Sequence, residues 1–219
     1  MSGGDLPIRE PPTAAGERTT LDDARVAGVV LAAGTSSRYG DRNKLLESVG
    51  GDDSDGDPIV RTATRTLLAA GLDPVVVVVG HEAARVAAAV ADLPVETVEN
   101  EAFAAGQSTS VAAGVEAVAA HDPPVDAAVV ALGDMPFVAP DTVRALVAAY
   151  AAGVGDVLAP AYEGRRGNPV LFDRRFFSAL ADVDGDVGGR AILLGSDDAA
   201  LVAVDDPGVR RDVDEPGDV

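Results

Sequence analysis

The sequence predicts a doubly wound α/β fold, in which helices cover both faces of a single, mostly parallel sheet. Short apolar runs alternate with alanine-rich segments of helical length between residues 26 and 204, which is the order of elements in such folds. Five consecutive valines at 75–79 lie between a proline and a glycine, as expected for a parallel strand buried on both faces. We expect residues 26–219 to form one domain. Residues 1–25 show no periodicity and are expected to be a disordered or loosely attached extension.

The individual elements follow from hydrophobic runs and from the residues that bound them. The expected strands are residues 26–33, 75–79, 95–98, 126–132, 156–160, 168–172 and 200–204. The expected helices are residues 59–70, 82–91, 107–120, 141–152, 174–180 and 189–194; the first of these is opened by Pro58 and ended by Gly71. In the common doubly wound order the first strand lies beside the fourth, so the loops after these two strands should face each other across a crevice.

The charge balance narrows the possible partners. The chain has 36 Asp and Glu against 17 Lys and Arg, a formal net charge of -19. Binding to nucleic acid through a basic face and docking on an anionic membrane both require clustered cations, so neither is expected. Together with a single lysine, Lys44, this balance indicates adaptation to high salt, where charge repulsion is screened. The alternative is an acidic but ordinary cytosolic protein.

The residue inventory also excludes some chemistry. The chain has no cysteine and two histidines, which excludes disulfides, thiolate metal sites and cysteine nucleophiles. No stretch approaches the ~20 apolar residues of a transmembrane helix, and the N-terminus lacks a signal-peptide pattern. We therefore expect a cytoplasmic protein.

The loop after the first strand is the first candidate site. Gly34 ends the apolar run, and Arg38 and Lys44 follow in a glycine-bounded polar loop. The loop matches neither the Walker A motif nor the dinucleotide fingerprint. Backbone amides and cations at the carboxyl end of a strand nevertheless suit a triphosphate. The alternative is a tight turn with solvated charges.

Two acidic positions could take part in the chemistry. Asp134 follows the fourth strand within Gly-Asp-Met-Pro, and a carboxylate there suits a hard cation such as Mg²⁺; the alternative is an aspartate that caps the next helix. In the tail, alternation around Val213 predicts a short terminal strand that directs Asp212 and Asp214 to one face. A run of solvated acidic residues is the alternative. The acidic stretch 50–57 lacks the features of an EF-hand and is expected to be a solvated turn.

Two glycine-flanked basic turns are candidates for binding an anion. One contains Arg165 and Arg166 and leads through Asn168 into a strand; the other runs from Gly185 through Asp186 to Arg190. Arginines grouped in so acidic a chain suggest an anionic ligand. An ordinary hairpin-type turn is an equal alternative for each.

Together these motifs resemble a known family. Leu31-Ala32-Ala33-Gly34 followed by Arg38, Gly40 and Lys44-Leu45-Leu46 is similar to the signature of nucleotidyltransferases related to molybdenum cofactor biosynthesis, the MobA-like superfamily. The similarity continues in order through Gly106-Gln107-Ser108, Gly133-Asp134-Met135-Pro136, Gly167-Asn168-Pro169-Val170 and Gly185-Asp186 to Arg190. Within this superfamily the chain most resembles the molybdenum cofactor cytidylyltransferases, because the guanylyltransferase branch begins Leu-Ala-Gly-Gly.

The resemblance implies a nucleotide-diphospho-sugar transferase-like fold and a set of roles. The implied nucleotide-binding residues are Leu31, Ala32, Ala33, Gly34, Arg38, Lys44, Gln107, Ser108 and Asp134, with Lys44, Arg38 and Asp134 catalytic. The implied acceptor-binding residues are Arg166, Asn168, Asp186 and Arg190, and the implied Mg²⁺ ligands are Asp134 and Asp214. The tail departs from the family pattern Asp-x-Asp-Thr-Pro-x-Asp, since Glu215 replaces the threonine and Gly217 the usual acidic residue.

The reaction implied is Mg²⁺-dependent transfer of CMP from CTP to the phosphate of a molybdopterin-type cofactor, with release of pyrophosphate. Alternatives are a guanylyltransferase on the same cofactor, a cytidylyltransferase for a sugar or polyol phosphate, and a catalytically silent nucleotide- or cofactor-binding chaperone. The expected partners are CTP or another nucleoside triphosphate, the phosphorylated acceptor and, transiently, a molybdoenzyme. We expect a monomer or a weak oligomer.

Overall fold

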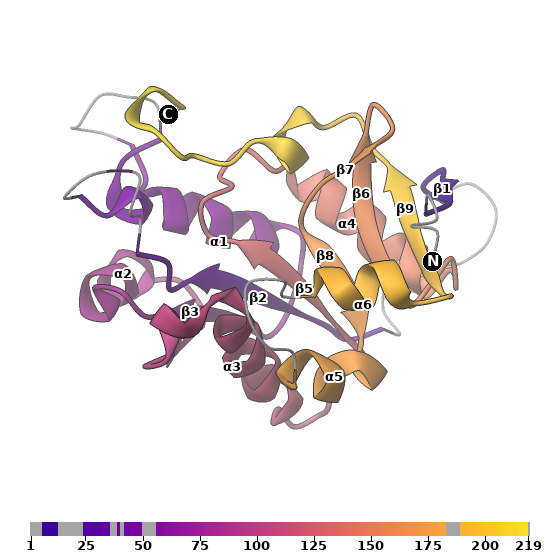
Figure 1. The fold of residues 1–219 in the computed structure, drawn as a ribbon, viewed down its shortest axis with the longest axis horizontal. Helices are drawn as coiled ribbons and strands as arrows, with labels where there is room; N and C mark the ends of the chain where they lie inside the picture. The colour runs from indigo at the N-terminus through magenta and orange to yellow at the C-terminus, as the bar shows by residue number, and fades with distance from the viewer. Residues whose placement is uncertain are drawn as a thin grey trace.

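The computed structural model describes residues 6–12, 24–35, 39, 42–49, 56–182 and 189–218. Within these residues one sheet has nine strands, in the order β1-β9-β6-β8-β5-β2-β3-β4, and β7 pairs with β6 beside this path (Figure 1). The strands are β1 Ile8–Arg9, β2 Val26–Ala32, β3 Val75–Val79, β4 Glu96–Glu99, β5 Ala127–Leu132, β6 Val157–Tyr162, β7 Arg165–Arg166, β8 Val170–Asp173 and β9 Ala199–Ala203.

Helices connect most of these strands. The α-helices are α1 Ile59–Ala69, α2 Ala83–Val90, α3 Gln107–Ala119, α4 Pro140–Ala151, α5 Phe177–Ala181 and α6 Arg190–Gly195. Short 3₁₀ helices are η1 Lys44–Leu46, η2 Phe103–Ala105, η3 Arg174–Phe176, η5 Pro207–Arg210 and η6 Pro216–Asp218. None of the helices in the described part of the chain is both long and apolar enough to cross a lipid bilayer.

The centre of the sheet is parallel, as predicted. β2 pairs in parallel with β3 on one side and β5 on the other, so Val30 lies between Val77 and Ala131. The first predicted strand therefore lies beside the fourth, and the loops after β2 and β5 leave the same edge of the sheet. β8 is antiparallel to both of its neighbours, β5 and β6. The prediction of a mostly parallel α/β fold is confirmed.

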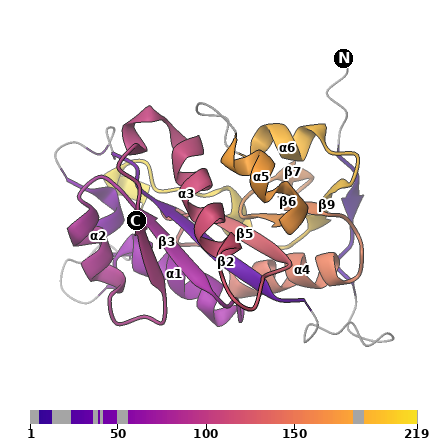
Figure 2. The ribbon, with the colours of Figure 1, turned by 90° about the horizontal axis from the view of Figure 1, so that it is seen from below.

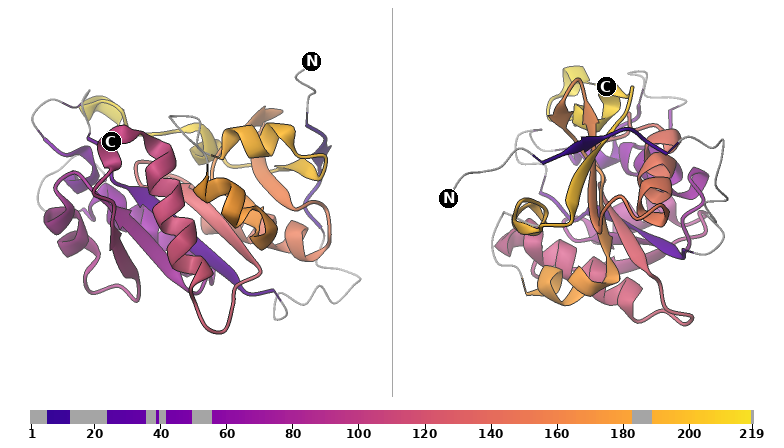
Figure 3. Two further views of the ribbon diagram at one scale, coloured as in Figure 1. Left: turned by 60° about the horizontal axis from the view of Figure 1, so that its bottom comes forward. Right: turned by 90° about the vertical axis from the view of Figure 1, so that its right-hand side faces the viewer.

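Helices cover both faces of the sheet. Because side chains of a strand alternate between its faces, each strand contributes to both cores. Val77 and Val79 pack with Ile59 in a core that includes residues of α1, α2 and α4. Val76 and Val78 pack with Val115 of α3 in the opposite core. Figures 2 and 3 show α3, α5 and α6 on one side of the sheet, with α1 and α4 on the other. All five valines of β3 are buried, which explains the uninterrupted apolar run.

Two parts of the chain differ from the sequence prediction. β1 lies within residues 1–25, and its Ile8 and Arg9 pair in parallel with Leu201 and Val202 of β9. This strand is short and half polar, so its sequence carries no strand signal of its own, and it is added at a sheet edge. Residues 211–214, which include the predicted terminal strand, are not a strand. The alternation there reflects one buried side chain, Val213, whose amide donates to a loop carbonyl instead of a strand.

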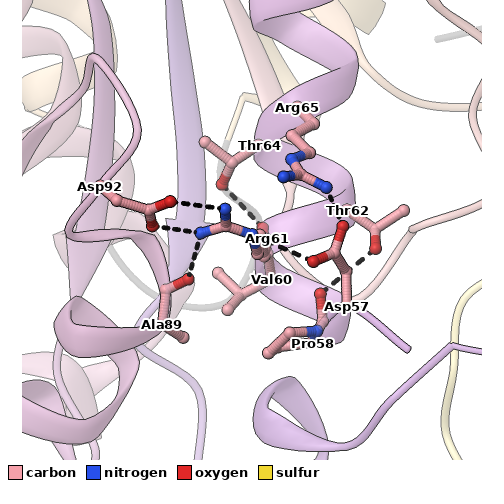
Figure 4. A network of polar contacts seen from close by, with 9 residues as sticks. All are labelled: Asp57, Pro58, Val60, Arg61, Thr62, Thr64, Arg65, Ala89 and Asp92. Carbon is pink, nitrogen blue, oxygen red and sulfur yellow. Dashed lines mark hydrogen bonds and ion pairs between the residues drawn. The ribbon is translucent and has the colours of Figure 1, made fainter. Parts of the chain in front are cut away.

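The segment that carries Lys44 is fastened to the start of α1. The amide of Val49 donates to the carbonyl of Asp57 at 3.1 Å, and that of Ile59 donates to Glu47 at 2.9 Å. Asp57 in turn is bound by Arg65 and, at 3.1 Å, by Arg61. Arg61 also reaches Asp92 just beyond α2, where its Nη2 donates at 2.8 Å (Figure 4). This network joins the beginning of α1 to the end of α2. Residues 50–55 of the predicted acidic turn lie outside the described residues.

Candidate active site

The site forms where β2 and β5 end side by side. The loop after β2 begins with Ala33 and Gly34, and Asp134 stands two residues beyond β5. The amide of Gly133 donates to the carbonyl of Leu31 at 2.9 Å, which holds the two loops together. This is the carboxyl edge of a parallel sheet, where ligands of open α/β folds bind.

Lys44 reaches this edge of the sheet from a turn whose neighbouring residues, Asn43 and Leu45, are buried. Buried Asn43 precedes η1, and its Oδ1 accepts the amide hydrogen of Leu45 at 3.1 Å. The Leu45 side chain is buried in the core beside it. With both neighbours fixed, the Lys44 side chain extends to Asp134, and its Nζ donates to Oδ2 at 2.7 Å.

Asp214 completes a three-residue cluster with Lys44 and Asp134. Lys44 Nζ donates to Asp214 Oδ1 at 3.2 Å, so one ammonium contacts both carboxylates. Asp212, the other carboxylate of the tail, is exposed. Of the two acidic residues considered for this position, Asp214 is therefore the one that converges with Asp134.

The charge state of Lys44 follows from these contacts. Burial opposes the charged form and lowers its pKa, but the hydrogen bonds and negative charges of Asp134 and Asp214 outweigh burial. The net effect raises the pKa of Lys44, so the side chain is an ammonium at neutral pH.

The two carboxylates, Asp134 and Asp214, are also a donor set that suits Mg²⁺. This ion commonly takes one or two protein carboxylates and completes its shell with phosphate oxygens and water. Across the described ranges, no group of three or more His, Cys, Asp or Glu side chains offers a site made of protein ligands alone.

The C-terminal segment holds Asp214 without regular secondary structure. Figure 1 shows this segment, in yellow, returning from the β9 side of the sheet across the molecule toward α1. The amide of Val213 donates to the carbonyl of Asp134 at 2.9 Å. Oδ2 of Asp218 accepts the amide hydrogens of Asp214 and Glu215 at 3.0 and 2.8 Å. The hydrogen bond from the Glu215 amide, followed by the smaller contribution of the bond from the Asp214 amide, lowers the pKa of Asp218. Sequence reasoning missed Asp218, because it put Gly217 in the place of the usual acidic residue. In the pattern Asp-x-Asp-Thr-Pro-x-Asp, Gly217 falls on the variable position and Asp218 on the last aspartate.

A cavity of about 490 Å³ opens beside the cluster, within the size range of small-molecule sites. Its lining includes predicted nucleotide-binding residues from both strand ends and from the start of α3, namely Leu31, Ala33, Gly34, Lys44, Gln107 and Asp134. Ala32 and Ser108 are buried and are not part of this lining. The serine that lines the cavity is Ser110, whose Oγ accepts a hydrogen bond from Asn100 Nδ2 at 3.0 Å. Arg38 lies outside the described residues.

A second cavity of about 350 Å³ adjoins the first and shares Leu31, Gln107 and Leu132 with it. Among the described residues, its polar lining consists of three predicted acceptor-binding residues, Arg166, Asn168 and Arg190, together with Gln107. The other described residues of the lining are Gly189 and the apolar Leu31, Val111, Val130, Leu132, Val170, Phe172 and Leu193. The fourth acceptor candidate, Asp186, lies outside the described residues.

The two arginines of the second cavity lie close enough for their positive charges to repel each other. Burial lowers the pKa of Arg166, and the nearby charge of Arg190 lowers it further. Within the described ranges, the structure shows no ion pair for either arginine, whereas Arg61, Arg144 and Arg175 each contact a carboxylate. Two neighbouring guanidinium groups that pair with no carboxylate in the described part of the chain form a cationic site that suits a bound anion.

A lysine and two carboxylates at the carboxyl edge of a mostly parallel sheet, beside two adjoining cavities, form an arrangement that can hold a polyphosphate and a second anion. The family of MobA-like NTP transferase domains matches residues 28–202. The chain belongs to this family of nucleotidyltransferases.

Several solved structures are similar to this chain over most of its length. Rv0371c from Mycobacterium tuberculosis H37Rv is 30% identical, with a TM-score of 0.73, covering 89% of this chain and 95% of that one. A crystal form of Rv0371c contains manganese. A nucleotidyl transferase from Methanothermobacter thermautotroptrophicus is 25% identical, with a TM-score of 0.72 and coverage of 89% and 94%.

Among curated proteins, the bifunctional protein GlmU of Dinoroseobacter shibae is 37% identical over 139 residues, which is 61% of this chain and 28% of that protein. The GlmU of Alkalilimnicola ehrlichii is 39% identical over 129 residues, 58% of this chain and 26% of that protein. The chain thus matches only about a quarter of the length of these curated relatives.

Proposed function

We propose that this protein transfers CMP from CTP to the phosphate of a molybdopterin-type cofactor, with release of pyrophosphate and in the presence of Mg²⁺. The observation that carries the proposal is the pair of adjoining cavities. Lys44 and Asp134 line the first, and Arg166 and Arg190 line the second. Two anionic substrates bound in contact with each other need this kind of arrangement, with separate positive charges for each.

In the first cavity the triphosphate would lie along the loop after β2. Lys44 would neutralise the triphosphate, and Arg38 of the same loop would assist. The amides at the start of α3 would add a favourable dipole. Gln107 and Ser108 are proposed to lie near the base or the ribose, with Ser110 as a further candidate because it lines the cavity.

Mg²⁺ would be held by Asp134 and Asp214 and would supply charge neutralisation at the phosphates. An oxygen of the acceptor phosphate attacks the α-phosphorus of CTP, forming a new phosphoanhydride bond. The bond from the α-phosphorus to the bridging oxygen breaks, and pyrophosphate leaves with the electron pair. This chemistry needs no protein nucleophile, so the residues act by positioning and by neutralising charge.

In the second cavity Arg166 and Arg190 would hold the acceptor's phosphate, while Asn168 and Asp186 would orient the rest of the molecule. The apolar side chains around them, among them Val170 and Phe172, favour a flat heterocyclic acceptor over a sugar. A sugar phosphate presents many hydroxyl groups, and each would require a polar partner. This lining is the specific reason to prefer a pterin-type acceptor.

The proposed location and partners rest on the amino-acid composition. We place the enzyme in the cytoplasm of a salt-adapted cell, as a monomer or weak oligomer. It would pass its product to a molybdoenzyme by transient contact. Nucleic acid and membranes are not proposed as partners.

The test is a matrix of four nucleoside triphosphates against candidate acceptors at high salt, with pyrophosphate as the readout. The acceptors are molybdenum cofactor, a sugar phosphate and a polyol phosphate. We expect release with CTP and molybdenum cofactor. Release with GTP instead would replace the cytidylyltransferase proposal by a guanylyltransferase, and release with a sugar or polyol phosphate would refute the acceptor. No release in any combination would support a silent binding protein.

A further inference from the structure

The Asp214 carboxylate is held by an irregular segment, so something other than a helix or a sheet must fix its position. The backbone around it is tied by Asp218, four residues later. Oδ2 of Asp218 accepts the amide hydrogen of Asp214 at 3.0 Å and that of Glu215 at 2.8 Å. One carboxylate oxygen thus closes the turn that presents Asp214 to Lys44.

The same turn is tied to the loop that carries Asp134. The guanidinium of Arg211 lies 3.8 Å from the centre of the Phe137 ring, three residues after Asp134. Its Nη2 donates to the backbone carbonyl of Asp218 at 2.8 Å. On the other side of Asp214, the amide of Val213 donates to the carbonyl of Asp134 at 2.9 Å. These contacts connect the two carboxylates through the backbone on both sides of Asp214.

We propose that Asp218 is a positioning residue, which sets the Asp214 carboxylate at the distance from Asp134 that a divalent cation requires. This inference rests on the proposed metal role of Asp134 and Asp214. Asp218 acts through the backbone of Asp214, because its Oδ2 is occupied by two amide hydrogens. Loss of that oxygen leaves both amides without this acceptor and lets the turn open. Partners that orient metal ligands typically change metal affinity ten- to hundredfold when removed.

The experiment measures binding of Mn²⁺ to the full chain by the electron paramagnetic resonance signal of the free ion, with and without α,β-methylene CTP. Asp218→Ala should weaken Mn²⁺ affinity by about ten- to hundredfold. Asp218→Asn should stay within about threefold of the unsubstituted protein, because the amide oxygen can still accept both backbone hydrogens. Asp205→Ala is the matched control: it removes one exposed carboxylate from the loop after β9 and should leave affinity unchanged.

Two results would overturn the inference. Affinity of Asp218→Ala equal to that of the unsubstituted protein would remove Asp218 from the site. Equal losses in Asp218→Ala and Asp218→Asn would show that the negative charge matters rather than the geometry. Thermal melting of each variant separates these results from unfolding. Binding of Mn²⁺ needs no acceptor, so a protein that fails to transfer CMP can still pass this test. If Asp134→Asn leaves Mn²⁺ binding unchanged, the metal part of the proposed function fails instead.

Discussion

The two cavities hold their positive charges in opposite ways. In the first, Lys44 is shared between Asp134 and Asp214. In the second, Arg166 and Arg190 show no ion pair among the described residues, and burial and then the charge of Arg190 lower the pKa of Arg166. The two guanidinium groups therefore repel each other, and a bound anion would relieve this repulsion. The comparison suggests a site for metal and nucleotide beside a site for a purely anionic group.

The largest expected effect comes from the carboxylate at the end of β5. Asp134→Asn keeps the shape of the side chain but removes the negative charge that we propose binds Mg²⁺. Transfer activity should fall by about a thousandfold or more, because neutralisation of the phosphates is the main catalytic contribution. Initial rates across a Mg²⁺ titration measure this. Activity with an unaltered Mg²⁺ dependence would contradict the metal role, and a melting curve provides the folding control.

Lys44→Ala should lower turnover by on the order of a hundredfold, because Lys44 is the cation that lines the first cavity among the described residues. Lys44→Arg is the matched variant that keeps the charge but changes its shape, and it should retain more activity. Single-turnover rates with saturating CTP would measure both. Turnover of Lys44→Ala close to that of the unsubstituted protein would remove Lys44 from the mechanism.

A substitution in the second cavity should separate the two substrates. Arg166→Ala should raise KM for the phosphorylated acceptor by about ten- to hundredfold, the range expected for one lost charge-assisted hydrogen bond. KM for CTP should stay within about twofold, because Arg166 does not line the first cavity and contacts there are unchanged. Arg165→Ala, at an exposed neighbouring position, is the control. Equal changes in both KM values would show that the two cavities do not bind the two substrates separately.

The smallest effect is expected in the network of Figure 4, whose residues line neither cavity. The hydrogen bonds from Arg61 hold the pKa of Asp92 at about 2, below its ordinary value of 3.8. A depressed carboxyl pKa contributes stability above the ordinary value, and this contribution is lost as pH falls from about 4 toward 2. The Asp92 side chain is 72% exposed, so the contribution is small. In Asp92→Asn the melting temperature should fall slightly at pH 7 and should depend less steeply on pH between 4 and 2. Parallel curves for both proteins would contradict this assignment.

Much of the fold was predictable because local patterns encode it. The valine run of β3 indicated a strand buried on both faces, and the alternation of elements indicated parallel pairing. Strand ends then indicated where Lys44 and Asp134 would meet. The prediction failed where no local pattern exists. β1 has only two residues, and it is a strand because it pairs with β9. The alternation around Val213 indicated a strand, but the Val213 amide donates to a loop carbonyl.

Within the site, the sequence alone singled out Lys44 as the only lysine and Asp134 as a carboxylate at a strand end, because composition and strand boundaries can be deduced without coordinates. Only the tertiary structure decided that Asp214, 170 residues from Lys44, joins them while Asp212 stays exposed. It likewise decided that Ser110 lines the cavity and that Asp218 closes the turn. The physical reason is that these choices depend on how an irregular segment and a helix rotate against the sheet, and contacts between distant residues determine that rotation.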